Sequence, residues 1–367
     1  MNRRPRVVVA GLGDTGLLTA IHLAPHAEVV GISAKPGLVS GQELGLRLTR
    51  PQEWERSYRI GFDRFHRLGD VRIVHGVVTD LAIQARAVQV RTADGSLHEE
   101  PYDALVIATG VSNGFWRTPA LRSEQEVTDE LRGAHAQIAS ADSVMVIGGG
   151  AAAVSSAWNI STTWPEKKVD LHFPGVHALP HHHPRVWRTL RPRLEERGVG
   201  LHGGHRAVVP DGFRADQITR DPVTWSTGQP AGTADAVLWA IGRATPNTAW
   251  IPREHLDDDG FVVVDDHLRV AGIDGVYAIG DVAATDPLRT SARARADRLL
   301  ARNIRADFGH GTPKRFKPLR RRWGSVLGAQ DNRLEVFSPQ GRPWTIPAWG
   351  ALEPWLVGRA IYKGIRR

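Results

Sequence analysis

The residues best suited to chemistry in this chain of 367 residues are two clusters of glycine, each following a run of apolar residues. The first is Gly11, Gly13 and Gly16 after residues 6–10, and the second is Gly148, Gly149 and Gly150 after residues 143–147. Apolar residues at helical spacing follow both clusters. In such a strand–turn–helix unit the glycines allow a tight turn, close approach of a pyrophosphate and packing of helix on strand. The helix then offers free N–H groups to phosphate.

The following segments complete two β-α-β units, with strands predicted at residues 28–32 and 168–173. Two more apolar segments end in a small residue and glycine: residues 102–110 close on Ala108, Thr109 and Gly110, and residues 234–242 close on Gly242. A strand within residues 275–283 ends at Gly280 and Asp281, whose carboxylate can accept hydrogen bonds from sugar hydroxyls. Two phosphate-binding turns imply two nucleotides, or a duplicated fold with one idle site.

The order of these segments predicts an α/β fold with two Rossmann-like, doubly wound dinucleotide-binding domains. We expect the first domain to be discontinuous, over residues 1–111 and 246–312, and the second to occupy residues 112–245. Alternation over residues 71–76, 76–81 and 87–92, with a turn at Asp94 and Gly95, predicts a small antiparallel insertion. Residues 313–367 form a separate C-terminal α+β region in this interpretation.

Composition excludes several chemistries. The chain contains no cysteine, which excludes disulfides, thiolate nucleophiles, iron–sulfur clusters and redox-active cysteine pairs. Redox chemistry must therefore use a bound cofactor. The sequence has neither a long apolar run for a spanning helix nor a signal-peptide pattern, so we expect a cytoplasmic protein, at most peripheral on the inner face of a membrane. Arginine outnumbers lysine 41 to 6, which is typical of GC-rich coding sequences and favours a bacterial source.

The C-terminal region holds most of the net charge of +8, because residues 314–367 contain 12 Lys and Arg against 3 Asp and Glu. Nucleic-acid-binding proteins more often carry cations on a folded groove, so no nucleic-acid partner is expected. Alternation predicts a strand within residues 325–337. The last residues, wound as a helix, place Val357, Ile361 and Ile365 on one stripe, with Trp355 and Tyr362 beside it and cations elsewhere. This pattern favours a membrane surface, and the alternative is a dimerisation or domain-packing helix.

Taken in order, these segments resemble the flavoproteins of the pyridine nucleotide-disulfide reductase superfamily over nearly the whole chain. The branch they resemble most contains type II NADH:quinone oxidoreductases and apoptosis-inducing-factor-2 (ferroptosis suppressor) quinone reductases. The resemblance implies that FAD lies against Gly11, Gly13, Gly16, Thr109, Gly110 and Asp281, and NADH or NADPH against Gly148, Gly150 and Ala153. The remaining predicted cofactor-binding residues are Asp14, Thr15, Ser33, Lys35, Ala108, Ala151, Gly242 and Gly280. The implied reaction is hydride transfer from NAD(P)H to flavin and then electron transfer to a quinone-like acceptor.

Several positions depart from the family pattern. Ser33, with Lys35 nearby, stands where an acid usually binds the adenosine ribose. Ser155 stands where the family often has a glutamate near flavin and nicotinamide, and Asn159 replaces another acid. The strand ending at His172 also lacks an acid, so His172 or Arg185 could accommodate a 2′-phosphate. The resemblance further places a helix start at Thr290 and Ser291 against the flavin ring, which makes Ser155, Thr290 and Ser291 the candidate catalytic residues.

Two other features have simpler interpretations. Consecutive histidines at 181–183 cannot all face one ion, so no metal site is expected and solvated loop histidines are favoured. An arginine row on the helix predicted from about 290 to 307 is interpreted as a solvated face.

Three functions stay open at this point. The first is an FAD-dependent NAD(P)H:quinone-like oxidoreductase, the second a flavoprotein reductase of a ferredoxin-like protein, and the third a nucleotide-binding sensor or scaffold with weak turnover. The sequence also leaves open whether the protein is a homodimer.

Overall fold

The computed structural model describes residues 3–41, 43–112, 118–213, 217–242, 244–285, 288 and 295–366. Its larger sheet has seven strands in the order β16-β8-β1-β2-β5-β6-β7. Four strands on one side of β5 (Val71–Ala82) each pair in parallel with the next strand in this order. They are β16 (Val276–Ala278), β8 (Ala104–Ile107), β1 (Arg6–Ala10) and β2 (Glu28–Ser33), of which β2 pairs with β5. Beyond β5, β6 (Ala87–Thr92) and β7 (Leu97–Pro101) pair antiparallel. Valine and isoleucine fill the central strands because both faces of this sheet region are covered.

The antiparallel extension differs from the prediction in one respect. Residues 71–76 and 76–81 are one strand, β5, rather than two. Its first half pairs in parallel with β2, and its second half pairs antiparallel with β6. A register shift between Val78 and Asp80 interrupts the second ladder, and such a bulge lets one strand bend between two partners.

The smaller sheet has five strands in the order β12-β11-β10-β14-β13. The central strand β10 (Ser143–Ile147) pairs in parallel with β11 (Lys168–Phe173) and β14 (Ala236–Trp239). At the edges, β12 (Gly200–Gly203) is parallel to β11, and β13 (Ile218–Thr219) is antiparallel to β14. Between the two sheets, β9 (Val111–Ser112) pairs with β15 (Thr245–Pro246), so the strands at the predicted domain boundaries meet each other.

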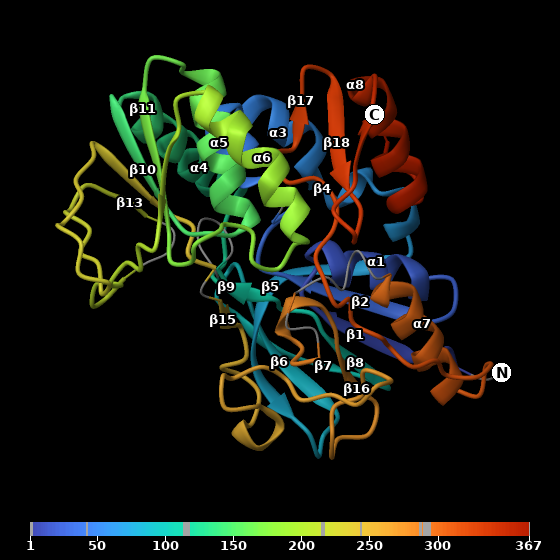
Figure 1. The fold of residues 1–367 in the computed structure, drawn as a ribbon. Helices are drawn as coiled ribbons and strands as arrows, with labels where there is room; N and C mark the ends of the chain where they lie inside the picture. The colour runs from blue at the N-terminus through green and yellow to red at the C-terminus, as the bar shows by residue number, and fades with distance from the viewer. Residues whose placement is uncertain are drawn as a thin grey trace.

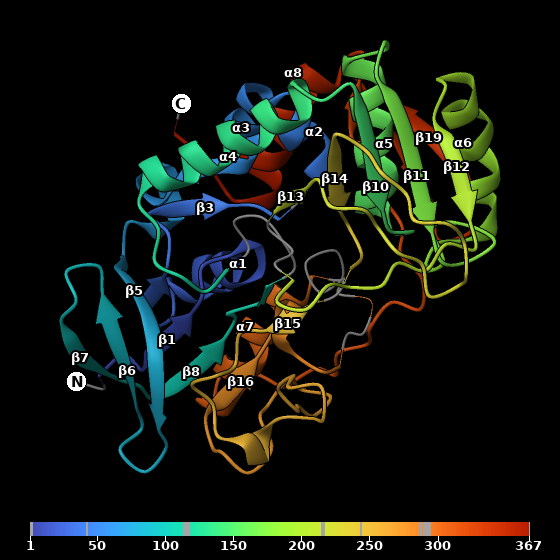
Figure 2. The ribbon, with the colours of Figure 1, turned by 90° about the vertical axis from the view of Figure 1, so that its left-hand side faces the viewer.

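The helices that cover the sheets are seen in Figures 1 and 2. On the larger sheet, α1 (Asp14–Leu23) packs against α7 (Ala296–Asp307). Next to the smaller sheet lie α4 (Glu124–Ala139), α5 (Ala151–Thr163) and α6 (Pro184–Glu196), whose apolar residues join one core cluster. The start of α4 is fixed by a capping box in which Ser123 and Glu126 bond each other's backbone N–H groups.

Two short helices from early in the chain pack with the smaller sheet. After the hairpin strand β3 (Gly37–Val39), α2 (Leu44–Thr49) and α3 (Pro51–Tyr58) lead into β4 (Arg59–Gly61), which pairs with β3. Leu46, Leu48 and Trp54 belong to the same apolar cluster as α4 and α5. Residues 44–58 therefore belong to the predicted first domain by their place in the sequence, but they pack in the apolar core of the smaller sheet.

The C-terminal region contains a three-stranded sheet and a helix. The predicted strand over residues 325–337 divides into β17 (Ala329–Gln330) and β18 (Arg333–Phe337), and β19 (Pro343–Ile346) completes the sheet. The helix α8 (Trp349–Trp355) continues as a π-helical segment, Leu356–Ile361. In Figure 1 this region, coloured red, lies beside the blue helix α3.

The expected stripe of Val357, Ile361 and Ile365 is wrong. Val357 and Ile365 pack against the core of the larger sheet and Tyr362 is buried there, whereas Ile361 is 40% exposed. The π-helical turn, in which the Tyr362 N–H donates to the Val357 carbonyl, is wider than an α-helical turn and changes which residues share a face.

Candidate functional site

The first glycine turn joins β1 to α1 at the carboxyl edge of the larger sheet. Gly11 has a φ of +103°, and a Cβ there would lie 2.4 Å from the Ala108 carbonyl oxygen. A Cβ at Gly16 would lie 2.0 Å from the Gly11 carbonyl oxygen. Gly13 differs, because a Cβ there would meet no heavy atom of the described residues within 4 Å. Two glycines therefore close the turn, and the third leaves open space at the helix N-terminus, where an anion binds favourably.

Three strand ends converge on this turn. Ala108 follows β8, and Gly280 follows β16, with its Cβ position 3.5 Å from the Thr15 side chain. Asp281 comes next, in a short 3₁₀ segment. Because β16, β8 and β1 are adjacent parallel strands, Gly11, Thr15, Ala108 and Gly280 gather at one edge of the sheet. The chain leaves β1 toward β2 on one side and returns to β8 on the other, which is the switch point where doubly wound sheets bind ligands.

The second glycine turn repeats this geometry between β10 and α5. Gly148 has a φ of +138°, and a Cβ there would lie 2.2 Å from the Ala240 carbonyl oxygen. A Cβ at Gly150 would meet nothing within 4 Å among the described residues. Ala151 begins α5, and the buried Ala153 packs in the core beneath it. The structure thus holds two matched cradles, each closed by a backbone carbonyl at the end of a neighbouring strand.

Thr109, Gly110 and Gly242 lie just beyond those two carbonyls. The Thr109 hydroxyl donates to the Asn247 carbonyl at 2.8 Å, and the Asn247 amide donates to the Thr109 carbonyl at 3.0 Å. Gly110 and Gly242 both have positive φ, 64° and 69°. These bonds connect the segment after β15 to the end of β8 at the first cradle. The sequence analysis did not identify Asn247 as part of this cradle.

Ser33 and Lys35 lie at the end of β2, as predicted. The Ser33 hydroxyl donates to the Lys35 carbonyl at 2.8 Å and accepts from the Lys35 N–H at 3.2 Å. The Lys35 ammonium donates to the Thr118 carbonyl at 3.3 Å. The side chain of Ser33 is therefore used in a local turn, and a role for it toward ribose stays a prediction.

Ser155 and Asn159 are buried on α5 beneath α2. A Cβ at Gly45 would lie 2.4 Å from the Ser155 carbonyl oxygen, so the two helices are in close contact. The Asn159 amide donates to the carbonyls of Ser155 and Leu327, at 2.8 and 3.0 Å, and its oxygen accepts from Arg50 and Gln330. Asn159 therefore links α5 to α2 and the C-terminal region. Thr290 and Ser291, the other candidate catalytic residues, lie outside the described residues.

The histidines divide into two structural groups. His183 caps α6, with its Nδ1 accepting from the Arg185 N–H at 3.1 Å, and His182 is buried. His172 lies between the parallel rings of His202 and Trp225, at centroid distances of 4.3 and 4.7 Å. His202 in turn bonds Asp170 at 2.8 Å. His172 is thus part of an aromatic stack on β11, and its predicted role toward a 2′-phosphate stays untested.

Because His172 is buried in this stack, we expect the free energy of unfolding to fall in acid. Burial, with His202 and His205 nearby, lowers the pKa of His172 to about 4 from 6.5, against opposing attraction from Asp170. The unfolded chain therefore takes up a proton between these pH values that the folded chain does not, and we expect a loss of about 2 kcal/mol of unfolding free energy from this residue as the pH falls from 6.5 to 4. Urea unfolding at both pH values should show a smaller loss in His172→Phe, and equal losses in the two proteins would contradict this assignment.

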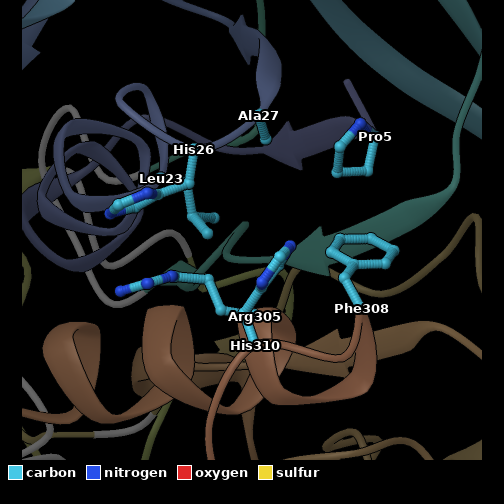
Figure 3. Close-up of a pocket in the computed structure, with 7 residues that line it drawn as sticks. All are labelled: Pro5, Leu23, His26, Ala27, Arg305, Phe308 and His310. Atoms are coloured by element: carbon cyan, nitrogen blue, oxygen red, sulfur yellow. The ribbon is translucent and has the colours of Figure 1, made fainter. Parts of the chain in front are cut away.

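A pocket among the described residues lies away from both cradles, at the opposite edge of the larger sheet. It lies between the C-terminal ends of α1 and α7 and is drawn in Figure 3, with a lining of Pro5, Leu23, His26, Ala27, Arg305, Phe308 and His310. Pro5 precedes β1, whereas the first cradle follows it. The candidate site is therefore the pair of glycine turns, where open space at two helix N-termini suits phosphate groups, and not this pocket.

Comparisons with known proteins show which family this sequence matches. A family model described as pyridine nucleotide-disulphide oxidoreductase matches residues 5–299. Ferroptosis suppressor protein 1 of Xenopus tropicalis is 26% identical over 332 residues, covering 85% of this chain and 83% of that protein. Oxidoreductase ptaL of Pestalotiopsis fici is 26% identical over 294 residues, covering 78% and 74%.

Solved structures share the fold. The water-forming NADH oxidase from Lactobacillus brevis, solved with NADH, superposes with a TM-score of 0.66 at 19% identity, covering 90% of this chain and 74% of that one. This likeness confirms the predicted Rossmann-like α/β fold. The family match extends over most of the sequence, including both cradles. The chain therefore belongs to the pyridine nucleotide-disulphide oxidoreductase family, although it contains no cysteine.

Proposed function

We propose that this protein is an FAD-dependent NAD(P)H oxidoreductase that passes electrons to a quinone-like acceptor. The observation that carries the proposal is the pair of matched cradles at Gly11–Gly16 and Gly148–Gly150, each at the carboxyl edge of a parallel sheet. Two cradles fit two dinucleotides. Bound flavin would supply the redox chemistry, accepting a hydride from the nicotinamide and passing electrons onward.

The chain's own residues would bind and orient the two dinucleotides. The N-termini of α1 and α5 offer N–H groups to the pyrophosphates, and the open space at Gly13 and Gly150 admits them closely. Asp281, at the end of the neighbouring strand, is suited to hydroxyl groups of a ribityl chain. Because the sequence has no cysteine, the electrons must leave the flavin without a thiol relay, which favours a small acceptor that reaches the flavin itself.

The experiment that tests this function is an anaerobic absorbance spectrum of the purified protein, before and after adding NADH or NADPH in separate samples. Flavin bands that bleach with one nucleotide, and recover on adding a water-soluble quinone, would support the proposal and identify the donor. A protein with flavin that never bleaches would favour the sensor or scaffold, and recovery only with a ferredoxin-like protein would favour that alternative.

We also propose that the C-terminal helix brings the protein to a lipid surface, where quinones reside. Trp355 is 55% exposed, and Leu352, Leu356 and Ile361 are each about 40% exposed on the same short helical region. Arg359 and Lys363 are exposed beside them. Aromatic and aliphatic groups with cations at one surface suit an anionic bilayer. No helix among the described residues has the length and apolar character needed to cross a membrane.

This second proposal predicts that pelleting with anionic vesicles depends on Trp355 and Leu356. In co-sedimentation with phosphatidylglycerol-containing vesicles, we expect the double variant Trp355→Ser/Leu356→Ser to lose at least tenfold in partition. Full burial of one apolar side chain is worth about 1.5–3 kcal/mol, and a tenfold change needs about 1.4 kcal/mol. Leu97→Ser is the matched control, since Leu97 is 65% exposed on the distant strand β7. Equal pelleting of all three proteins would overturn the lipid surface and favour the dimerisation alternative, which sedimentation velocity would then detect.

A further inference from the structure

The first cradle contains an acidic residue where a phosphate-binding turn would gain from having none. Asp14 is the first residue of α1, directly after Gly13. A carboxylate at a helix N-terminus interacts favourably with the helix dipole. A pyrophosphate at the same N-terminus would use the same interaction, and two anions there repel each other. Asp14 is thus a built-in competitor for the ligand of this turn.

The structure shows three donors that hold this carboxylate on one side. Asp14 Oδ2 accepts from the Ser40 hydroxyl at 3.2 Å and from the Gly41 N–H at 3.4 Å. Asp14 Oδ1 accepts from the Tyr362 hydroxyl at 3.3 Å. Ser40 and Gly41 follow β3, and Tyr362 belongs to the C-terminal segment 348 residues away. The carboxylate is therefore drawn toward β3 and the C-terminal segment.

Tyr362 is firmly placed to act as a donor. Its side chain is buried and its ring meets Phe65 edge to face at a centroid distance of 5.3 Å. The residues that follow pair with the segment around Phe65: Ile365 forms a β-bridge with Phe65, and the Arg366 N–H donates to the Arg64 carbonyl at 2.7 Å. Burial and the nearby Asp14 raise the pKa of the Tyr362 hydroxyl, so it stays protonated and donates.

We infer that Tyr362 and Asp14 together set the affinity of the first glycine turn for its dinucleotide, with Tyr362 holding the Asp14 carboxylate away from the pyrophosphate. This inference rests on the proposed function, because it takes FAD as the ligand of that turn. According to this inference, the C-terminal segment contributes to the cofactor site. Tyr362 takes no part in the redox reaction and is a positioning residue that acts through Asp14.

The test is a double-mutant cycle read out as the dissociation constant of FAD, measured by recovery of flavin fluorescence when the purified holoprotein is diluted. Asp14→Asn keeps the shape and removes the charge, and we expect FAD to bind roughly tenfold more tightly at low ionic strength, with a smaller gain in high salt. Tyr362→Phe releases the carboxylate, and we expect FAD to bind roughly threefold to tenfold more weakly. In the Asp14→Asn background, Tyr362→Phe should change the dissociation constant by less than about twofold.

Tyr277→Phe is the matched control, because Tyr277 is also a buried tyrosine whose hydroxyl donates to an aspartate, Asp307 at the far end of α7. It should leave FAD affinity unchanged. Weaker or equal binding in Asp14→Asn, or the same loss from Tyr362→Phe in both backgrounds, would overturn the inference and assign Tyr362 a purely structural role. A parent protein that binds no FAD would instead show that the proposed function itself is wrong.

Discussion

Gly150→Ala is expected to slow nucleotide-driven bleaching of the flavin by at least about 100-fold while leaving the protein folded and flavin-bound. Gly150 has a φ of −84°, which alanine adopts freely, and the new methyl group would meet no described heavy atom within 4 Å. The methyl would instead occupy the space through which a pyrophosphate approaches the helix. Displacement of a bound group by about 1 Å can cost roughly 100-fold in rate. We therefore expect at least this loss in the second-order rate of flavin reduction by NAD(P)H, measured by stopped-flow absorbance.

Gly13→Ala is the partner variant in the other cradle. Its φ of −72° and open surroundings also permit alanine, so the fold should be kept. We expect this variant to lose flavin and to keep nucleotide binding at the second cradle. It should purify with little flavin, and its tryptophan fluorescence should be quenched by NAD(P)H as in the parent protein. If both variants reduced flavin at the parent rate, the assignment of two dinucleotide cradles would fail.

Gly148→Ala serves as the contrast that separates binding from folding. At Gly148 the backbone has positive φ, and the methyl would collide with the Ala240 carbonyl oxygen at 2.2 Å. We expect destabilisation of about 3 kcal/mol or more, visible as a lowered melting temperature in the absence of nucleotide. Melting temperatures of Gly148→Ala and Gly150→Ala should therefore differ clearly, although the two residues are neighbours in one turn.

Asn159→Leu is expected to destabilise the protein by about 3 kcal/mol, because it removes a buried hub of hydrogen bonds. Asn159 is 1% exposed, and its amide serves α5, Arg50 after α2, and both Leu327 and Gln330 in the C-terminal region. Leucine fills a similar volume but leaves the Leu327 carbonyl without this donor and the Arg50 guanidinium without this acceptor. Urea unfolding would measure the loss.

Ser156→Ala is the matched control on the same helix. Ser156 is fully buried, but the bond that its hydroxyl donates goes to the Ala152 carbonyl within α5. The expected cost is below about 1 kcal/mol. Limited proteolysis adds a second readout, since only Asn159→Leu should speed cleavage within residues 325–340. Equal stability of the two variants would show that Asn159 does not connect the C-terminal region to the core.

Local pattern was enough to predict the elements that carry the cradles. The strands predicted at residues 6–10, 143–147 and 168–173 coincide with β1, β10 and β11, and the two glycine clusters follow β1 and β10. These elements could be predicted because the apolar run, the glycines and the helical spacing all lie within one short stretch of sequence. The Ala108 and Ala240 carbonyls that close the two turns come from strands far away in the sequence. The prediction was wrong where a strand or helix departs from its regular period, as at the bulge in β5 and the π-helical turn before Tyr362.

Sequence reasoning did not find the contacts between segments far apart in the chain. Nothing near Asp14 indicates Tyr362, and nothing near Tyr58 indicates Glu353, which bonds Ser57 and Tyr58 from α8 and whose pKa is raised by burial there. The contact between α2 and Ser155 was also not indicated by the sequence: it depends on Gly45, which lets the two helices approach closely. A role for Ser155 beside the cofactors stays a prediction.

Residue type and short-range spacing were enough to predict the α/β class and the two glycine turns, and the absence of cysteine was enough to exclude thiol chemistry. Three features became visible only in the folded chain: α2 and α3 join the apolar core of the smaller sheet, Asn159 connects three segments by hydrogen bonds, and the C-terminal segment reaches the first cradle. Those features depend on which surfaces meet once the chain is closed. The local sequence does not show whether a carboxyl or amide side chain, such as that of Asp14 or Asn159, is solvated, paired or buried, because this depends on the packing around it.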